Sequence, residues 1–345
     1  MLPILIALAL ALAAPQQVPP THETITVERI IVDARVTLAN GEAILGLTAK
    51  DFDVRVDGVL AKVESADWIP DTAAAREIAG IDNPRSTVNE SMDVPAPQGR
   101  LLIFFFQTDF ARQDVRLQGQ VKIMSYADQI IDSLEPEDRV AVFSYDSHLK
   151  FRLDFTDDKE QIRQAMRDSL AIDEPPPPPV VPMPSLARRL DRQQMKDASS
   201  QEHALFLVGN ALHPIPGPKS LLLFGWGLGK LAGGRVHMGG EYMIAKRALE
   251  SSRVSVFSID ITQADWHSLG VGLAQAAADT GGFYESSYLF PQLAVNRLER
   301  TLQGHYELEV RKPELKTIGV HAIEVNVPRR GAVVMARSTY IDKAQ

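Results

Sequence analysis

The chain has 345 residues, a formal net charge of −8 and 45% hydrophobic residues, enough for a sizeable core and about two domains. A chain this acidic lacks the net basic face that phosphate binding requires, so a nucleic-acid partner is disfavoured. The absence of cysteine excludes a disulfide framework, a thiolate zinc site and a cysteine nucleophile.

Residues 2–14 form an uncharged apolar run that is too short to span a bilayer, for which about 20 residues are needed. Ala11, Leu12 and Ala13 give this run the A-x-A pattern of a signal-peptide cleavage site. We therefore interpret residues 1–13 as a signal peptide, with an uncleaved anchor or a chance buried segment as the alternatives. The mature chain is then expected to be exported, periplasmic or secreted. No later segment is long and apolar enough to cross a bilayer, so the mature chain is not expected to insert in a membrane.

Residues 23–70 show the period-two alternation of β-strands, with turn signals at Asn40-Gly41 and Asp57-Gly58. They predict an N-terminal β segment. The polar stretch that follows, residues 71–99, is rich in Pro, Asn, Ser and Asp and lacks periodicity. We interpret it as a linker.

Residues 100–303 alternate between apolar runs and helical patterns. Strands buried on both faces are expected at 101–106, 139–145, 220–224 and 254–259, and an edge strand at 149–155. Helices are expected at 114–134, 157–170, 186–212, 241–251, 273–278 and 289–302. Thr156 is a plausible N-cap for the second helix. The proline-rich run 174–184 is expected to be a stiff loop rather than a docking motif. Strands alternating with helices predict a doubly wound, mainly parallel α/β sheet.

Residues 304–342 alternate in the manner of β-strands again. Each β flank alone is too small to enclose a good core. We therefore expect the N- and C-terminal segments to pair into one small β-sandwich, with the α/β domain of residues 100–303 inserted between them.

The order of several short stretches resembles the acidobacterial family of von Willebrand factor type A-related proteins. These stretches are residues 32–36, 47–54, 134–142, 153–158, 254–260 and 277–282. The resemblance covers nearly all of the mature chain. It implies a von Willebrand factor type A-like fold for the α/β domain, but no defined biochemical role.

Domains of this type usually bind a divalent metal through Asp-x-Ser-x-Ser after the first strand, a Thr in a later loop and an Asp after the fourth strand. Mg²⁺ takes oxygen ligands in an octahedron, with one vertex left for a partner's carboxylate. Here Gln107, Thr108 and Asp109 stand at the first motif, and Trp226 replaces the last Asp. No Thr occurs from 157 to 261. The resemblance therefore implies a degenerate site without a metal, with Asp109 and Asp114 as the candidate replacement ligands in the alternative.

A glycine-rich stretch follows the strand at 220–224. Gly227, Gly229 and Ala232 match the dinucleotide fingerprint by letter, but a glycine-rich crevice loop that includes Gly233 and Gly234 explains the pattern equally well. The histidines show no metal-binding spacing, and no Gly-x-Ser-x-Gly elbow occurs.

Loops at the carboxyl ends of parallel strands converge on one crevice, which we expect to be the binding surface. Its expected residues are Gln107, Thr108, Asp109, Asp146, Gly225, Trp226, Gly227 and Asp260. Trp226 is either a contact residue or a cap on the core, and Asp260 is more simply a turn-forming residue than a catalytic acid. No catalytic residue, metal or cofactor is expected.

The sequence thus favours a non-enzymatic extracytoplasmic protein-interaction module whose protein partner is unknown. Two alternatives remain at this point. One is a metal-dependent adhesion domain that uses replacement ligands. The other is an enzyme with a nucleotide or hydrolytic site in the glycine-rich crevice.

Overall fold

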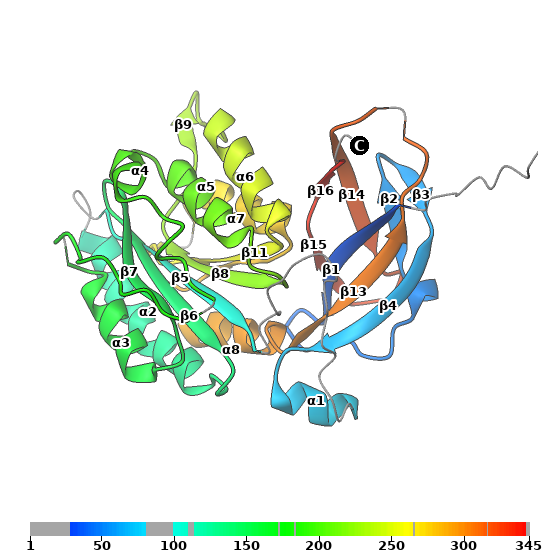
Figure 1. The fold of residues 1–345 in the computed structure, drawn as a ribbon, viewed down its shortest axis with the longest axis horizontal. Coiled ribbons are helices and arrows are strands. Elements are labelled where there is room, and N and C mark those ends of the chain that lie inside the picture. Colours follow the sequence, from blue (N-terminus) through cyan, green and yellow to red (C-terminus); the bar gives the residue numbers. More distant parts are fainter. Residues whose placement is uncertain are drawn as a thin grey trace, which may run out of the picture.

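A computed structural model describes residues 28–80, 99–109, 114–171, 173–182, 184–264, 266–315 and 317–342. Figure 1 shows an α/β layer structure on one side and a β-sandwich on the other. The expected signal peptide, residues 1–13, lies outside the described residues. Within the described ranges, no helix combines the length and the apolar character that crossing a bilayer requires.

The central sheet has six strands in the order β12-β11-β8-β5-β6-β7. They are β5(Leu101–Gln107), β6(Arg139–Tyr145), β7(Leu149–Thr156), β8(Lys219–Gly225), β11(Val254–Asp260) and β12(Tyr284–Ser286). Every neighbouring pair is parallel except β6 and β7, so β7 is the antiparallel edge strand that its alternating pattern predicts. The expected doubly wound, mainly parallel α/β sheet is confirmed.

Helices cover both faces of this sheet, because its apolar strands have no solvent-facing side. On one face lie α2(Asp114–Asp132), α3(Lys159–Asp168) and α8(Pro291–Thr301), which share a core with Phe104 and Phe106. On the other lie α4(Arg192–Asp197), α5(Gln201–Leu212), α6(Gly240–Ser251) and α7(Gly270–Thr280). This second face shares a core with Ile103 and Phe105 (Figure 1).

The N- and C-terminal β segments form one sandwich, as expected from their small individual cores. One sheet has the order β15-β1-β13-β4, and the other has the order β16-β14-β2-β3. The first contains β1(Arg29–Thr37), β4(Val63–Pro70), β13(Gly304–Arg311) and β15(Val333–Ala336). The second contains β2(Asp53–Val56), β3(Val59–Ala61), β14(Val320–Asn326) and β16(Thr339–Ile341). The short 3-10 helix η1(Ala49–Asp51) precedes β2. Since β13 pairs with both β1 and β4, the two ends of the chain share one core.

Three local expectations were wrong. The helix after β7 is capped by Asp158 rather than Thr156, because the Asp158 carboxylate accepts the N–H groups of Glu160 and Gln161. The single helix expected over 186–212 is divided into α4 and α5, which have separate N-caps at Asp191 and Ser200. The segment expected as a linker begins with a short helix, α1(Ala73–Ala79), while residues 81–98 lie outside the described ranges.

Buried polar contacts join the amino ends of the parallel strands to the sandwich. Arg253, before β11, donates from Nε to Asp33 of β1 at 2.9 Å. Arg35 of β1 donates to the hydroxyls of Ser255 at 3.1 Å and Ser220 at 3.4 Å. The sandwich therefore covers one edge of the α/β sheet, and the carboxyl ends of the strands form the opposite, open edge.

The contact between the α/β domain and the sandwich also includes a buried carboxyl group. Its protonation makes the stability of the protein depend on pH. Glu250 of α6 accepts hydrogen bonds from Thr339 of β16, and burial raises its pKa to about 7 despite those bonds and the nearby Lys246 charge. The folded protein therefore holds a proton on Glu250 that the unfolded chain releases near pH 4.5. This group's contribution to the free energy of unfolding is full below that pH and is lost as the pH rises to about 7.

We predict that Glu250→Gln, which stays neutral, removes this pH dependence. Urea unfolding between pH 5 and 8 should show the variant gaining stability relative to wild type as the pH rises. Glu77→Gln on the exposed face of α1 serves as the control and should follow the wild-type profile. Parallel profiles for Glu250→Gln and wild type would contradict a protonated Glu250.

Candidate functional site

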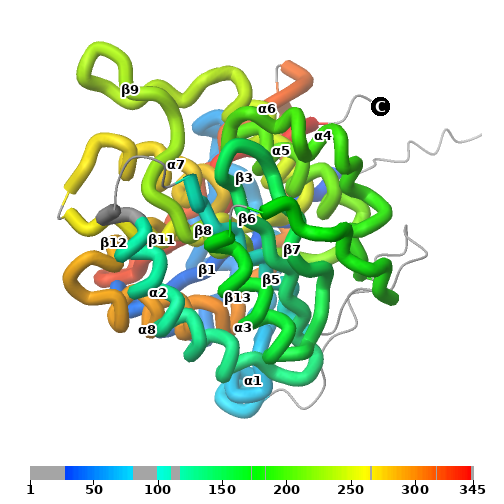
Figure 2. The backbone as a smooth tube through the Cα atoms, turned by 90° about the vertical axis from the view of Figure 1, so that its left-hand side faces the viewer, coloured from blue at the N-terminus to red at the C-terminus, as the bar shows by residue number. Residues whose placement is uncertain are grey.

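The carboxyl ends of β5, β6, β8 and β11 meet at the open edge, which faces the viewer in Figure 2. Gln107, Gly225 and Asp260 are the last residues of three of these strands, and Asp146 follows the fourth. Parallel strands place their ends at one edge, so the residues expected from the sequence lie at that edge. The side chains, however, form separate local networks rather than one cluster.

Gln107 forms the first network. Its side chain is buried, and its Oε1 accepts hydrogen bonds from the backbone N–H of Trp226 at 2.8 Å and of Gly227 at 3.2 Å. Gly225 leaves room for this contact, because a Cβ there would lie 2.9 Å from the same oxygen. The amide oxygen thus joins the end of β5 to the loop after β8.

Asp109 and Trp226 form a second contact between the same two loops. The indole Nε1 of Trp226 donates to Asp109 Oδ1 at 2.6 Å, while the Trp226 ring packs partly buried against the core on the α2 and α8 face. Thr108 turns to the neighbouring strand, where its backbone N–H donates to the carbonyl of Tyr145 at 2.7 Å. The structure therefore places Trp226 as a cap on the core whose indole N–H donates to Asp109.

These residues do not fit a divalent cation. A magnesium ion needs converging oxygen ligands, usually with one or two carboxylates. The oxygen of Gln107 is directed at two N–H groups, and Trp226 offers no ligand. Within the described ranges, no group of three or more His, Asp or Glu side chains is arranged to hold a metal ion.

Asp260 belongs to a third network at the end of β11. Its buried Oδ2 accepts from the hydroxyl of Tyr284 at 2.7 Å and lies 2.6 Å from Nε2 of His267. Its Oδ1 accepts from the N–H of Thr262 at 2.9 Å. Burial, and then the Asp260 charge, raise the pKa of Tyr284 well above its usual value. Asp260 therefore organises the turn after its strand.

Asp146 lies at the end of β6 and is held by its own loop. It accepts from the ammonium of Lys150 at 2.5 Å and from the N–H of Ser147 at 2.5 Å. Burial opposes ionisation here, but these hydrogen bonds lower the pKa of Asp146 below its usual range. It is therefore an ionised carboxylate at the rim of the crevice.

Sequence reasoning missed three residues beside this rim. Tyr145 ends β6 with its side chain almost fully buried. Glu202, in the first turn of α5, accepts from the N–H of Gly229 at 2.8 Å, and Glu241, in the first turn of α6, accepts from the hydroxyl of Ser200 at 2.7 Å. Neither helix start shows a pattern in the sequence that links it to the strand ends.

The glycine-rich stretch has a different form from the expected crevice loop. It enters a hairpin of β9(Lys230–Ala232) and β10(Arg235–His237), with Gly233 and Gly234 at positive φ in the turn. A dinucleotide fingerprint requires a helix to begin at this point, because the helix N-terminus holds the pyrophosphate. Here a hairpin stands where that helix would have to begin. The structure therefore does not support dinucleotide binding at the glycine-rich stretch.

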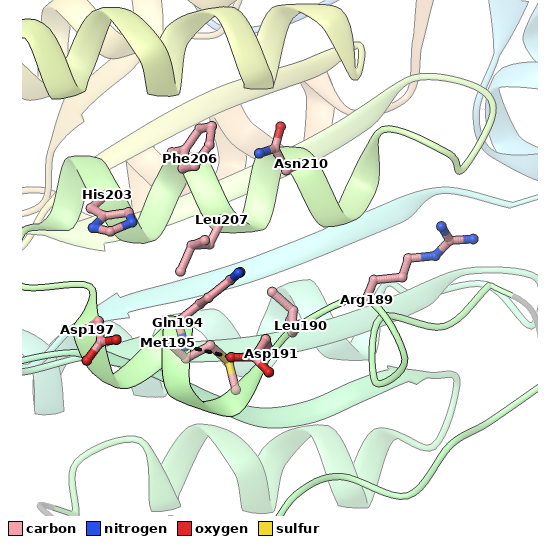
Figure 3. Close-up of a pocket in the computed structure, with 10 residues that line it drawn as sticks. All are labelled: Arg189, Leu190, Asp191, Gln194, Met195, Asp197, His203, Phe206, Leu207 and Asn210. Atoms are coloured by element: carbon pink, nitrogen blue, oxygen red, sulfur yellow. Dashed lines mark hydrogen bonds between the residues drawn. The ribbon is translucent and has the colours of Figure 1, made fainter.

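A cavity of about 440 Å³ lies beside α4 and α5 (Figure 3). It is lined by Arg189, Leu190, Asp191, Gln194, Met195, Asp197, His203, Phe206, Leu207 and Asn210. In this view Asp191 is engaged as the N-cap of α4, accepting from the N–H of Gln194. The cavity does not include any of the expected strand-end residues.

No family model and no curated protein matches the sequence. Solved structures that align include the conserved hypothetical protein BatB from Bacteroides thetaiotaomicron. The alignment has 15% identity and a TM-score of 0.38, and it covers 59% of this chain and 98% of that chain. A von Willebrand factor type A protein from Catenulispora acidiphila has 9% identity, 89% and 74% coverage and a TM-score of 0.39. Proximal thread matrix protein 1 from the mussel byssus has 13% identity, 59% and 47% coverage and a TM-score of 0.41. These overall similarities are low, and the fold assignment rests on the strand order of the sheet itself.

Two buried glutamines offer a matched test of the site geometry. Gln107→Met should lower the free energy of unfolding by about 1–3 kcal/mol, because the N–H groups of Trp226 and Gly227 lose their acceptor. Gln120 of α2 is fully buried, and neither of its polar atoms has a hydrogen-bond partner. Gln120→Met should therefore be neutral or stabilising. Equal destabilisation by both substitutions, measured by urea unfolding, would contradict a stabilising role for the hydrogen bonds that Gln107 accepts.

Proposed function

We propose that this chain is a non-enzymatic, extracytoplasmic protein-interaction module with a degenerate metal-ion-dependent adhesion site. Its partner surface is the open edge where the carboxyl ends of β5, β6, β8 and β11 meet. One observation carries the proposal: the buried oxygen of Gln107 accepts the N–H groups of Trp226 and Gly227, where the resemblance places an ion-binding carboxylate.

The surface is composed of strand-end residues and their immediate neighbours. They are Gln107, Thr108, Asp109, Asp146, Gly225, Trp226, Gly227 and Asp260. In a metal-binding domain of this type, the ion would anchor a carboxylate of the partner. A neutral amide cannot do so, and partner binding must then use hydrogen bonds, apolar contact or the charges of the protein itself.

The wider assignment is part of the same proposal. The chain would belong to the acidobacterial family of von Willebrand factor type A-related proteins, and residues 1–13 would direct its export. The division places an α/β domain of residues 100–303 between β segments 23–70 and 304–342, with 71–99 as the linker. The pairing of β13 with β1 and β4 supports an inserted domain.

The alternatives gain less support from the site. The Asp260–His267 pair would orient an imidazole for hydrolysis, but no hydroxyl of the described residues is hydrogen-bonded to His267 as a nucleophile would be. Replacement ligands are also disfavoured, since Asp109 already accepts the Trp226 indole N–H. The side chain of Asp114 lies outside what the structure describes.

A photocrosslinking experiment tests the location of the surface. Benzoylphenylalanine would replace Trp266, which is 74% exposed in the loop after β11, or Ile318, which is 73% exposed in the sandwich. Irradiation in the native envelope should link a partner at position 266 but not at 318. An equal yield at both positions, or a link at 318 alone, would refute the proposed surface.

The same crosslink tests the metal-free mechanism. We predict that its yield at position 266 stays unchanged in 5 mM EDTA and in 5 mM Mg²⁺, because no bound ion takes part in the contact. Purified protein should also show an unchanged melting temperature under both conditions. Loss of the crosslink in EDTA, with recovery in Mg²⁺, would favour the metal-dependent alternative.

A further inference from the structure

The cavity beside α4 and α5 takes no part in the contacts of the proposed function. Its volume of about 440 Å³ falls in the range of small-molecule sites, which span about 300–1,000 Å³. In Figure 3, Leu190 and Gln194 point from the α4 side, and Leu207 from the α5 side, into the gap between the two segments. His203 lies at one end of this gap and Arg189 at the other. The two ends therefore differ in chemistry.

The floor of the cavity is apolar. Leu207 belongs to the core on this face of the sheet, and Leu190, Met195 and Phe206 pack against that core while they remain partly exposed. The packing of the short helix α4 on α5 thus leaves apolar surface open to the cavity. Covering that surface removes it from water, which favours the binding of a ligand with an apolar part.

The charges around the cavity favour an anion. Residues 188–197 carry four basic and two acidic side chains, in a protein whose formal net charge is −8. Both acidic side chains already accept hydrogen bonds at 2.9 Å, Asp191 from the N–H of Gln194 and Asp197 from Nε2 of Gln193. Arg189, by contrast, forms no ion pair and no side-chain hydrogen bond within the ranges that the structure describes. The unpaired charge at the cavity is therefore positive.

Three uncharged side chains complete the polar rim. Gln194, His203 and Asn210 line the cavity, and their side-chain polar atoms make no hydrogen bond to any described residue. Each amide offers two N–H donors and a neutral imidazole offers one, whereas an ionised carboxylate is an acceptor only. A carboxylate could therefore use the free donors of this rim, while an ammonium group would be repelled by Arg189.

We propose that this cavity binds a small carboxylate that carries an apolar chain or ring. The apolar part would lie over Leu190, Met195, Phe206 and Leu207, and the carboxylate would pair with Arg189. An ion pair with an exposed arginine contributes little by itself, so the apolar contact supplies most of the affinity and Arg189 the preference for an anion. The cavity shares no residue with the proposed partner surface, so this inference does not depend on the proposed function.

Titration of the full chain with 4-phenylbutyrate and its uncharged amide, 4-phenylbutyramide, tests the chemistry. NMR would follow the methyl signal of Met195, identified by its loss in Met195→Leu, with Met243 on the exposed face of α6 as the control signal. Both probes should shift the Met195 signal saturably, the carboxylate with an at least fivefold lower dissociation constant, and Met243 should not respond. Equal dissociation constants, or no saturable shift of Met195 at 10 mM carboxylate, would overturn the proposal.

Two adjacent arginines provide a matched test of the charge. Arg189→Gln should raise the dissociation constant of 4-phenylbutyrate to that of the amide and leave the amide's affinity unchanged. Arg188→Gln removes the same charge from a neighbouring exposed position that does not line the cavity, and it should change neither affinity. An equal effect of both substitutions, or none from either, would refute the pairing of the carboxylate with Arg189.

Filling the cavity tests its location. Gln194 is exposed on α4, so Gln194→Trp should fold with an unchanged melting temperature, place an indole in the gap and abolish the binding of both probes. Gln118→Trp, at an exposed position on α2, is the control and should bind both probes as wild type does. Undiminished binding by Gln194→Trp would place the probes elsewhere on the protein and overturn the proposal.

Discussion

The buried amide oxygen of Gln107 accepts two backbone N–H groups from the loop after β8, and this contact determines what the open edge of the sheet can do. Glycine at position 225 leaves space for it, because a Cβ there would lie 2.9 Å from the same oxygen. It also fixes the backbone of Trp226, whose indole then donates to Asp109. In the proposed assignment, these hydrogen bonds occupy the place where a type A domain usually gathers ligands for an ion.

The proposed replacement of an ion ligand by Gln107 would also change the charge balance of the open edge. A bound divalent cation would offset the acidic side chains at the strand and helix ends, whereas a neutral amide leaves their charge in place. The sandwich contacts the opposite edge through hydrogen bonds such as that from Arg253 to Asp33. The fold thus leaves the carboxyl ends of the strands uncovered by the sandwich.

The sequence was most informative where a pattern reports burial. The unbroken apolar run of β5 identified a strand covered on both faces, and the two alternating flanks were each too small to stand alone. It was less informative where several residues compete for one role, as when Asp158 caps α3 in place of Thr156. The contact between Glu202 and the N–H of Gly229 could not be predicted, because it depends on how α5 packs beside the loop after β8. The glycine-rich stretch was misleading, because paired glycines suit a hairpin turn as well as a phosphate loop.

The central claim is that hydrogen bonds to Gln107 replace an ion. The most direct measurement is a ¹⁵N-correlated NMR spectrum that follows the indole N–H of Trp226 and the amide N–H groups of Trp226 and Gly227 during addition of Mg²⁺ to 10 mM. The account predicts that these three signals keep their positions and that the two amides exchange slowly with solvent. Saturable shifts of the three signals at millimolar Mg²⁺ would show that an ion enters the site and would contradict the account.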